Sequence, residues 1–271
     1  MKTFARSFII MIGFFTRLPV PKVEFTEDLY RRAMLLMPIG GLVIGAILVL
    51  LQLALTWIGA PGLLCGAVLT GAYIYLTGGL HLDGLADTFD GIFSGRSRKQ
   101  SLEIMKDSRI GVFGTLGLFM TGIFYFAAFS EISGIGLLVF PVCGRACCLI
   151  SASLAPYARE EGMGKATSMG GGTGAVISSV ISLIGASFLT IPMLILDIFL
   201  WSHNVILGDL FLTPLITSLI SSAVAVLVTI FITMKIKKKL GGVTGDTFGA
   251  VIEVSSLVYM FVFIILRGLF A

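Results

Sequence analysis

Three aspartates in one short segment have the spacing of a metal site on a helix. The segment, residues 81–90, reads His-Leu-Asp-Gly-Leu-Ala-Asp-Thr-Phe-Asp. On a helix with about 100° per residue, Asp83, Asp87 and Asp90 fall within roughly a 60° arc. Three carboxylates on one face repel one another, so a helix that carries them needs a counter-charge. Hard oxygen ligands favour Mg²⁺, which often binds substrate phosphates at the same time. The alternative interpretation is a solvated acidic helix end beside a membrane.

The stretch Met-Lys-Asp-Ser-Arg-Ile-Gly (105–111) could bind phosphate groups. Arg109 offers a bidentate fork and Lys106 a point charge, and both suit phosphate oxygens. Asp107, between them, could serve as a further metal ligand. A charged turn next to a membrane is common, so this interpretation depends on the position of the stretch, one loop after the three aspartates.

Two ionisable residues fall within otherwise apolar runs. Arg145 lies in Pro-Val-Cys-Gly-Arg-Ala and Glu253 lies in Gly-Ala-Val-Ile-Glu-Val. A charge inside a membrane costs about 2.5–3.5 kcal/mol on insertion scales, so both are functional candidates. They could pair with each other or contact a substrate. His81 points away from the aspartate arc; it could bind substrate if the helix begins at Asp83, or be a hydrogen-bonded interfacial histidine.

Two glycine-rich segments also carry charged residues. Arg159 lies in the segment 156–164, and Asp246 lies in the segment 241–249. Glycine-rich backbone lets main-chain N–H groups approach a phosphate closely, although a glycine loop alone is a weak signal. Glu253 follows Asp246 by seven residues and would share its face on a helix that begins early.

The composition is typical of a protein surrounded by lipid. Of the 271 residues, 56% are hydrophobic and 13% are charged, against about 25% charged in soluble domains. Mean hydropathy is +1.02. The basic residues form no stripe interleaved with aromatics, so nucleic-acid binding is not supported. The four cysteines lie in apolar runs, where small packing residues are expected rather than a zinc site.

Seven apolar runs are long enough to cross a bilayer, which takes about 20 residues as a helix. Residues 4–15 are too short to cross, and their apolar residues at helical spacing predict an interfacial helix. The sequence therefore predicts an all-α, polytopic transmembrane helical bundle of about seven spans. We expect a single integral-membrane domain over residues 1–271, with an N-terminal interfacial segment over 1–30. The predicted spans are 35–58, 62–80, 111–130, 133–155, 174–200, 210–234 and 248–269.

The basic residues indicate how these spans are oriented. Seventeen of the 19 Lys and Arg residues lie in the N-terminal stretch or in the loops 81–110, 156–173 and 235–247. The positive-inside rule places these segments in the cytoplasm and, with seven spans, the C-terminus outside. The region 81–110 would then be an acidic and basic active-site region on the cytoplasmic face of the membrane.

Six segments, taken in order along the chain, match a known pattern. The most specific are Thr-Gly-Gly-Leu-His-Leu-Asp-Gly-Leu-Ala-Asp-Thr-Phe-Asp-Gly (77–91) and Met-Lys-Asp-Ser-Arg-Ile-Gly-Val-Phe-Gly (105–114). The others are Phe-Phe-Thr-Arg-Leu-Pro-Val-Pro (14–21), Gly-Arg-Ala (144–146), Pro-Tyr-Ala-Arg (156–159) and Thr-Gly-Asp (244–246). Together they resemble the cobalamin synthase family, the adenosylcobinamide-GDP ribazoletransferases, over nearly the whole chain.

The resemblance implies phosphoryl transfer across a diphosphate with a requirement for Mg²⁺. Adenosylcobinamide-GDP and α-ribazole would give adenosylcobalamin and GMP, with the ribose 5′-hydroxyl as nucleophile. α-Ribazole 5′-phosphate would be accepted as well and would give the 5′-phosphate of the product. The implied partners are these small molecules and the lipid bilayer of a bacterial or archaeal cell membrane. A second copy of the chain and other enzymes of nucleotide-loop assembly are further candidate partners.

Fitted to this reaction, the candidate residues divide into three groups. Mg²⁺ would be held by Asp83, Asp87 and Asp90, of which the first two are also catalytic candidates. One carboxylate free of metal, Asp107 or Asp246, could accept the hydroxyl proton. The candidates for substrate binding are His81, Lys106, Arg109, Arg145, Arg159 and Glu253.

Two other kinds of protein share some of these features. Secondary transporters place charges near the bilayer midplane, whereas most acids of this chain fall at one predicted membrane face. CDP-alcohol phosphotransferases also combine membrane-helix aspartates with Mg²⁺. Their Asp-Gly-x-x-Ala-Arg pattern fails here, because Asp83-Gly-Leu-Ala is followed by Asp87 rather than Arg.

Overall fold

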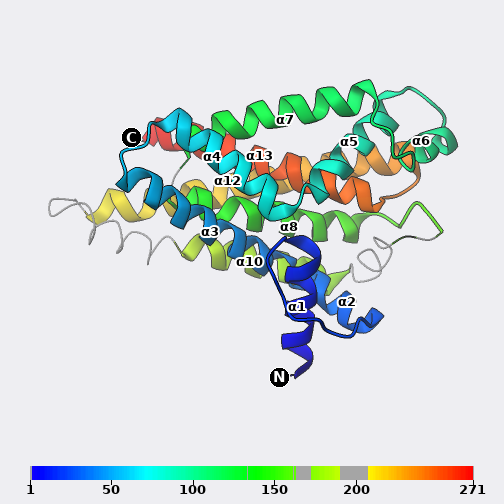
Figure 1. The fold of residues 1–271 in the computed structure, drawn as a ribbon, viewed down its shortest axis with the longest axis horizontal. Helices are drawn as coiled ribbons and strands as arrows, with labels where there is room; N and C mark the ends of the chain where they lie inside the picture. Colours follow the sequence, from blue (N-terminus) through cyan, green and yellow to red (C-terminus); the bar gives the residue numbers. More distant parts are fainter. Residues whose placement is uncertain (1, 133, 161, 163–171, 190–206, 271) are drawn as a thin grey trace.

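Most of the residues that the computed structural model describes form α-helices (Figure 1). Within the described part there are eleven helices and no strand, with only an isolated bridge between Tyr157 and Val243. The all-α polytopic bundle predicted from the sequence is confirmed. The structure describes residues 2–132, 134–160, 162, 172–189 and 207–270.

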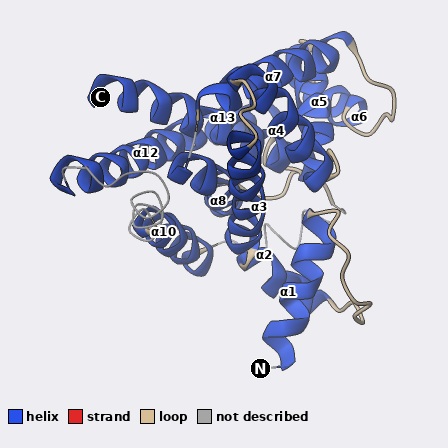
Figure 2. Ribbon diagram, turned by 60° about the vertical axis from the view of Figure 1, so that its left-hand side comes forward, coloured by secondary structure: helices blue, strands red, loops and turns tan. Residues whose placement is uncertain are grey.

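Five helices are long and apolar enough to cross a membrane. One of them, α8, lies at the centre of the bundle and is buried along its whole apolar length. Three of the others and the shorter helix α10 (Thr173–Phe188) pack around it, which explains why α8 is apolar on every face (Figures 1 and 2). The five are α3 (Met37–Trp57), α7 (Val112–Glu131), α8 (Gly134–Leu154), α12 (Leu207–Leu240) and α13 (Gly245–Phe270).

The acidic segment lies on a short helix that follows a sharp bend. Helices α4 (Gly62–Thr77) and α5 (Leu80–Phe93) meet at an angle of 89°. Gly78 and Gly79 form the break, with φ of +63° and +72°, a left-handed conformation that residues with a Cβ atom rarely adopt. The bend carries residues 81–90 away from the direction of α4, so the predicted span 62–80 is only one arm of a bent pair.

Each of the seven predicted apolar runs contains a helix. The bent pair counts as one further span beside the five long helices, which gives up to six by length and composition. The remaining run, 174–200, contains α10, which has 16 residues. The later part of that run lies outside the described residues.

The N-terminal region forms two helices at one side of the bundle (Figures 1 and 2). Helix α1 (Lys2–Phe15) confirms the helix predicted over residues 4–15. Its outer end is exposed, whereas Ile12 and Phe15 are buried. Helix α2 (Glu27–Leu35) begins after Thr26, whose hydroxyl accepts a hydrogen bond from the Leu29 N–H at 3.3 Å. The interfacial position of this region stays a prediction.

Candidate active site

Helices α5 and α13 cross closely because glycine stands at both contact points. A Cβ atom at Gly84 would lie 2.7 Å from the carbonyl oxygen of Asp246, and one at Gly249 would lie 2.8 Å from the carbonyl oxygen of His81. Either distance is too short for a real side chain, so the two backbones approach to a separation that only glycine allows. The crossing brings the aspartates of α5 beside the first turn of α13.

Three carboxylates from the two helices gather at this crossing. Asp83 is exposed, and Asp87 and Asp246 are half-buried. The charge of Asp246 and, after it, those of Asp83 and Asp90 repel the carboxylate of Asp87, and Asp83 also repels Asp246. We call Asp83, Asp87 and Asp246 the acid cluster. Two of its members come from the predicted metal site, and the third is the aspartate of the distant glycine-rich segment.

Asp90, the third predicted metal ligand, has a different environment. It is buried, and its Oδ2 and Oδ1 accept hydrogen bonds from the N–H groups of Gly111 at 2.7 Å and Gly114 at 2.9 Å. It therefore caps the start of α7. Seven residues of helix rise also place it about 10 Å along the axis from Asp83. Among the described residues, no three His, Cys, Asp or Glu side chains are grouped to hold a metal ion by themselves, which applies to the predicted triad and to the acid cluster alike.

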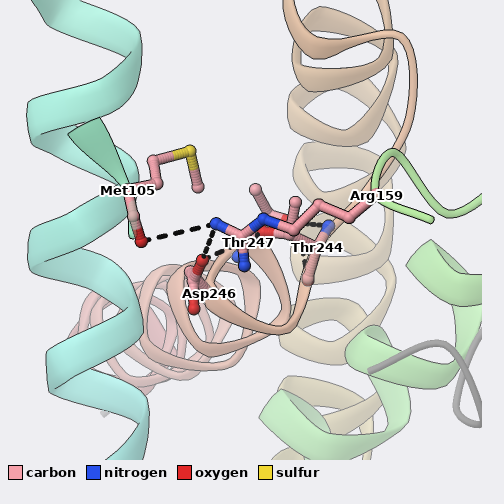
Figure 3. A network of polar contacts seen from close by, with 5 residues as sticks. All are labelled: Met105, Arg159, Thr244, Asp246 and Thr247. Carbon is pink, nitrogen blue, oxygen red and sulfur yellow. Dashed lines mark hydrogen bonds and ion pairs between the residues drawn. The ribbon is translucent and has the colours of Figure 1, made fainter. Parts of the chain in front are cut away.

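Arg159 joins the acid cluster through an ion pair (Figure 3). Its Nη2 lies 2.7 Å from Oδ2 of Asp246 and donates a second hydrogen bond, at 3.3 Å, to the carbonyl oxygen of Met105. Both charged side chains are largely buried, so water screens their attraction less than at an exposed pair. The contact unites three segments that the sequence presents separately.

A pair of backbone hydrogen bonds holds the two glycine-rich segments together. The Val243 N–H donates to the carbonyl oxygen of Pro156 at 2.8 Å, and the Ala158 N–H donates to the carbonyl oxygen of Val243 at 2.8 Å. This two-bond clip comes directly before Arg159 in one segment and shortly before Asp246 in the other. It fixes the distance between the two charged residues.

Two threonines cap the first turn of α13. The Thr244 N–H donates to Oγ1 of Thr247 at 2.7 Å, and the Thr247 N–H donates to Oγ1 of Thr244 at 3.2 Å (Figure 3). The Thr244 hydroxyl also donates to Oδ2 of Asp246 at 3.4 Å. A helix N-terminus carries partial positive charge that stabilises a nearby carboxylate. Asp246 is thus held by Arg159, by Thr244 and by the helix end.

The predicted phosphate ligands Lys106 and Arg109 lie on the surface, in the connection between α6 (Arg98–Ile104) and α7. Arg109 pairs with Asp107, with Nη2 and Oδ2 separated by 2.6 Å. Hydrogen bonds from Arg109 lower the pKa of Asp107 to about 2. The pair and Asp90, which caps α7, together line a cavity of about 350 Å³.

Arg145 and Glu253 are fully buried inside the bundle. Glu253 accepts hydrogen bonds from the hydroxyls of Tyr125 at 2.5 Å and Tyr73 at 3.2 Å. Arg145 donates from Nη1 to the carbonyl oxygen of Pro141 at 3.0 Å. The two charges attract each other, but no ion pair within 4 Å joins them in the described structure. The two tyrosines were not predicted, because nothing in their local sequence marks them as partners of a distant acid.

A cavity of about 150 Å³ opens beside the acid cluster. His81, Asp83 and Asp246 line it, and most of the remaining lining is apolar. Because α5 begins at Leu80, His81 belongs to the helix and is buried, 3% exposed. The aromatic part of the lining, which the sequence did not predict as part of the site, consists of Phe14, Phe15, Tyr30 and Phe248.

The chain is similar to relatives named adenosylcobinamide-GDP ribazoletransferase. The relative from Acetivibrio thermocellus is 39% identical, over 97% of this chain and 99% of its own. Those from Fusobacterium nucleatum and Escherichia coli K12 are each 34% identical, over 98% and 94% of this chain and 99% and 98% of their own. No solved structure matches the chain.

A family model described as cobalamin-5-phosphate synthase matches residues 7–264. The match includes α5, the first turn of α13 and Arg159, and therefore every residue that builds the acid cluster and its ion pair. The resemblance drawn from the sequence is confirmed. The chain belongs to the cobalamin-5-phosphate synthase family.

Proposed function

We propose that this enzyme transfers adenosylcobinamide phosphate from adenosylcobinamide-GDP to the 5′-hydroxyl of α-ribazole and releases GMP. α-Ribazole 5′-phosphate would serve as an alternative acceptor and give the 5′-phosphate of the product. The names of the relatives support the choice of donor and acceptor. The observation that carries the proposal is the acid cluster with Arg159 at the crossing of α5 and α13.

The acid cluster has the chemistry of a Mg²⁺ site shared with a diphosphate. Three carboxylates that repel one another favour a divalent cation between them. Mg²⁺ usually takes one or two carboxylates and fills its other positions with water and phosphate oxygens. A Mg²⁺ ion with only one or two protein carboxylates does not require a group of three protein ligands, and the described residues contain no such group. Asp83 and Asp87 would hold the ion, which when bound would neutralise the diphosphate and the leaving GMP phosphate.

Asp246 would accept the proton of the nucleophile. In the reaction, the 5′-oxygen of the ribose forms a bond to the cobinamide phosphorus, and the bond from that phosphorus to the oxygen of GMP breaks. The hydroxyl proton passes to a carboxylate. Asp107, the other predicted base, has a pKa of about 2, so it accepts a proton poorly near neutral pH.

Arg159 would orient both the base and the phosphate. Its Nη2 holds Asp246, whereas its buried Nε has no hydrogen-bond partner within the described structure. A guanidinium can donate to two acceptors along different edges of its plane. One edge would keep Asp246 in position while another donates to a phosphate oxygen, where negative charge develops during transfer.

We further propose that the site faces the cytoplasm of a bacterial cell. The acid cluster and Arg159 lie within the segments 81–110, 156–173 and 235–247, which the sequence predicts as cytoplasmic and which carry most of the basic residues. The lipid bilayer is therefore the immediate partner of the apolar helices. The charged substrates would reach the site from the aqueous side.

The direct test is a coupled assay with purified protein in liposomes. Adenosylcobinamide-GDP and α-ribazole should give GMP and adenosylcobalamin in equal amounts, and chelation of Mg²⁺ should stop both. Folded wild-type protein that releases no GMP from this pair in the presence of Mg²⁺ would contradict the proposal. Release of a different nucleoside monophosphate from another diphosphate would redirect it.

A further inference from the structure

We propose that the cavity beside the acid cluster binds the flat heteroaromatic base of the acceptor nucleoside, and that His81 donates a hydrogen bond to a ring nitrogen of that base. This proposal rests on the proposed function, because it assigns one part of an acceptor to one part of the same site.

The size of the cavity fits a fragment rather than a whole substrate. Its volume is about 150 Å³, whereas pockets that enclose a drug-sized ligand measure about 300–1,000 Å³. A corrinoid is much larger than such a ligand and would have to remain outside. A bicyclic base is the largest flat part of the acceptor, so it is the part that a small cavity can take.

Most of the residues that line the cavity are aromatic or apolar. Phe14 packs edge-on against Tyr30, with ring centroids 5.4 Å apart, and against Phe15, with centroids 4.8 Å apart. Met37 and Ile252 add aliphatic surface. Aromatic pairs of this kind present flat faces and edges on which another aromatic ring packs well. A guanine base would bring several polar groups to a wall that cannot pair with them.

His81 supplies the one specific polar contact that such a base needs. Its ring lies 5.8 Å from that of Phe15, tilted by 30°, and the residue is 3% exposed. Its Nε2 is buried and has no hydrogen-bond partner in the part of the chain that the structure describes. Buried polar atoms are nearly always hydrogen-bonded, so an unsatisfied one at a cavity wall points to a ligand atom.

The backbone of His81 is fixed by the crossing of the two helices. Its carbonyl oxygen faces Gly249 of α13 at a separation that would not admit a Cβ atom. The imidazole is therefore carried on packed helical backbone. With its proton on Nε2, the ring donates one in-plane hydrogen bond. In a benzimidazole nucleoside, one ring nitrogen bonds the ribose and the other keeps an in-plane lone pair that accepts such a bond.

The position of the cavity connects the base to the chemistry. Asp83 and Asp246 line the same cavity as His81. A nucleoside whose base occupies the aromatic end would extend its ribose toward the carboxylates, where Asp246 can take the proton of the 5′-hydroxyl. The donor diphosphate would lie on the other side of the acid cluster, near Asp87 and Arg159.

The test compares two acceptors that differ in one atom: benzimidazole riboside and indole riboside, in which C–H replaces the free ring nitrogen. Wild-type protein in liposomes should show a KM about tenfold lower for the benzimidazole compound, the worth of one hydrogen bond to a buried group. His81→Leu should abolish that preference, and His81→Gln, which keeps a donor, should retain part of it. The KM for adenosylcobinamide-GDP should stay within about twofold in both variants.

A second pair of variants tests the cavity independently of His81. Phe15→Leu removes an aromatic wall and should raise the KM of the acceptor severalfold. Phe119→Leu makes the same change on the exposed face of α7, where Phe119 is 65% exposed, and should alter neither KM. Phe119→Leu therefore shows whether the change in the acceptor KM requires the loss of a ring that lines the cavity.

The outcomes are distinct. Equal KM values for the two ribosides in wild-type protein, or a preference that survives in His81→Leu, would overturn the proposal. In the His81→Leu and Phe15→Leu variants, a rise in the KM for adenosylcobinamide-GDP with no change in the KM for the acceptor would place the guanine base in the cavity instead. If wild-type protein makes no GMP with any acceptor, the proposed function fails first, which is a different result from an active enzyme that ignores the ring nitrogen.

Discussion

Arg159 and Asp246 form an ion pair 2.7 Å long although 87 positions separate them in the chain. The pair exists because the backbone clip between Pro156 and Val243 holds their two loops side by side. The two residues come from separate glycine-rich segments, each a weak signal in the sequence, and the pair joins them in one charged site. The site then combines a fixed carboxylate with a guanidinium that can still donate to a phosphate.

Removal of Arg159 should damage catalysis more than folding. Arg159→Ala is expected to lower kcat/KM by about 10²–10³-fold, the usual loss when one donor to a developing charge is removed. Arg159→Lys should recover only part of this, because an ammonium lacks the planar fork. The matched control is Arg32→Ala, which breaks the exposed pair with Asp28 on α2 and should leave kcat/KM unchanged. Equal losses in both variants would rule out a special role for Arg159.

The crossing of α5 and α13 should not tolerate a methyl group. Gly84→Ala is expected to cost about 1–3 kcal/mol of stability through overpacking against the backbone of Asp246, and to reduce activity by moving that residue. Gly71→Ala on α4 is the control, because nothing lies within 4 Å of the added atom. That change should be neutral or stabilise by about 0.5–1 kcal/mol. Thermal unfolding in detergent measures both, and a Gly84→Ala protein as stable as Gly71→Ala would contradict the close crossing.

Asp90 should behave as a structural residue. Asp90→Ala leaves the N–H groups of Gly111 and Gly114 without their acceptor and is expected to cost about 1–3 kcal/mol. Asp90→Asn keeps one oxygen acceptor and should cost less. In neither variant should the Mg²⁺ concentration for half-maximal activity change more than about twofold at a temperature where the protein is folded. A large increase in that concentration would return Asp90 to the metal site.

Asp107 should not appear in the pH dependence of the reaction. Its pKa, about 2 beside Arg109, lies below the ordinary value of 3.8, so the carboxylate is ionised throughout the working range. Because the folded-state pKa is the lower one, the pair contributes stability at neutral pH and loses it only as the pH falls toward 2. Asp107→Asn should therefore leave the acid limb of the kcat/KM profile between about pH 5 and pH 8 in place. A shift of that limb would identify Asp107 as the base after all.

Much of the fold could be predicted because it depends on local pattern. Apolar runs of bilayer length gave the helices, and helical spacing placed Asp83, Asp87 and Asp90 on one helix. The bend at Gly78 and Gly79 was harder to predict, since consecutive glycines in an apolar run are also compatible with a continuous span. The prediction of a span over 62–80 missed the change of direction for this reason.

The membership of the site depended on contacts between distant segments. Spacing on one helix could not show that Asp90 caps α7, because its partners, Gly111 and Gly114, are backbone amides more than twenty residues away. The sequence named Asp246 and Arg159 as candidates, but their pairing follows from the clip and the glycine crossing. Such contacts have no signature in the spacing of residues along the chain.

We propose that Asp83, Asp87 and Asp246 act together in catalysis and that Asp90 does not. The most direct measurement is the rate of Mg²⁺-dependent GMP release by the four Asp→Asn variants, each shown to be folded, with saturating adenosylcobinamide-GDP and α-ribazole. Asp83→Asn, Asp87→Asn and Asp246→Asn should each lose about 10²–10⁴-fold in rate, and Asp90→Asn should remain within about tenfold of wild type. An Asp87→Asn protein that releases GMP at the wild-type rate would contradict the claim.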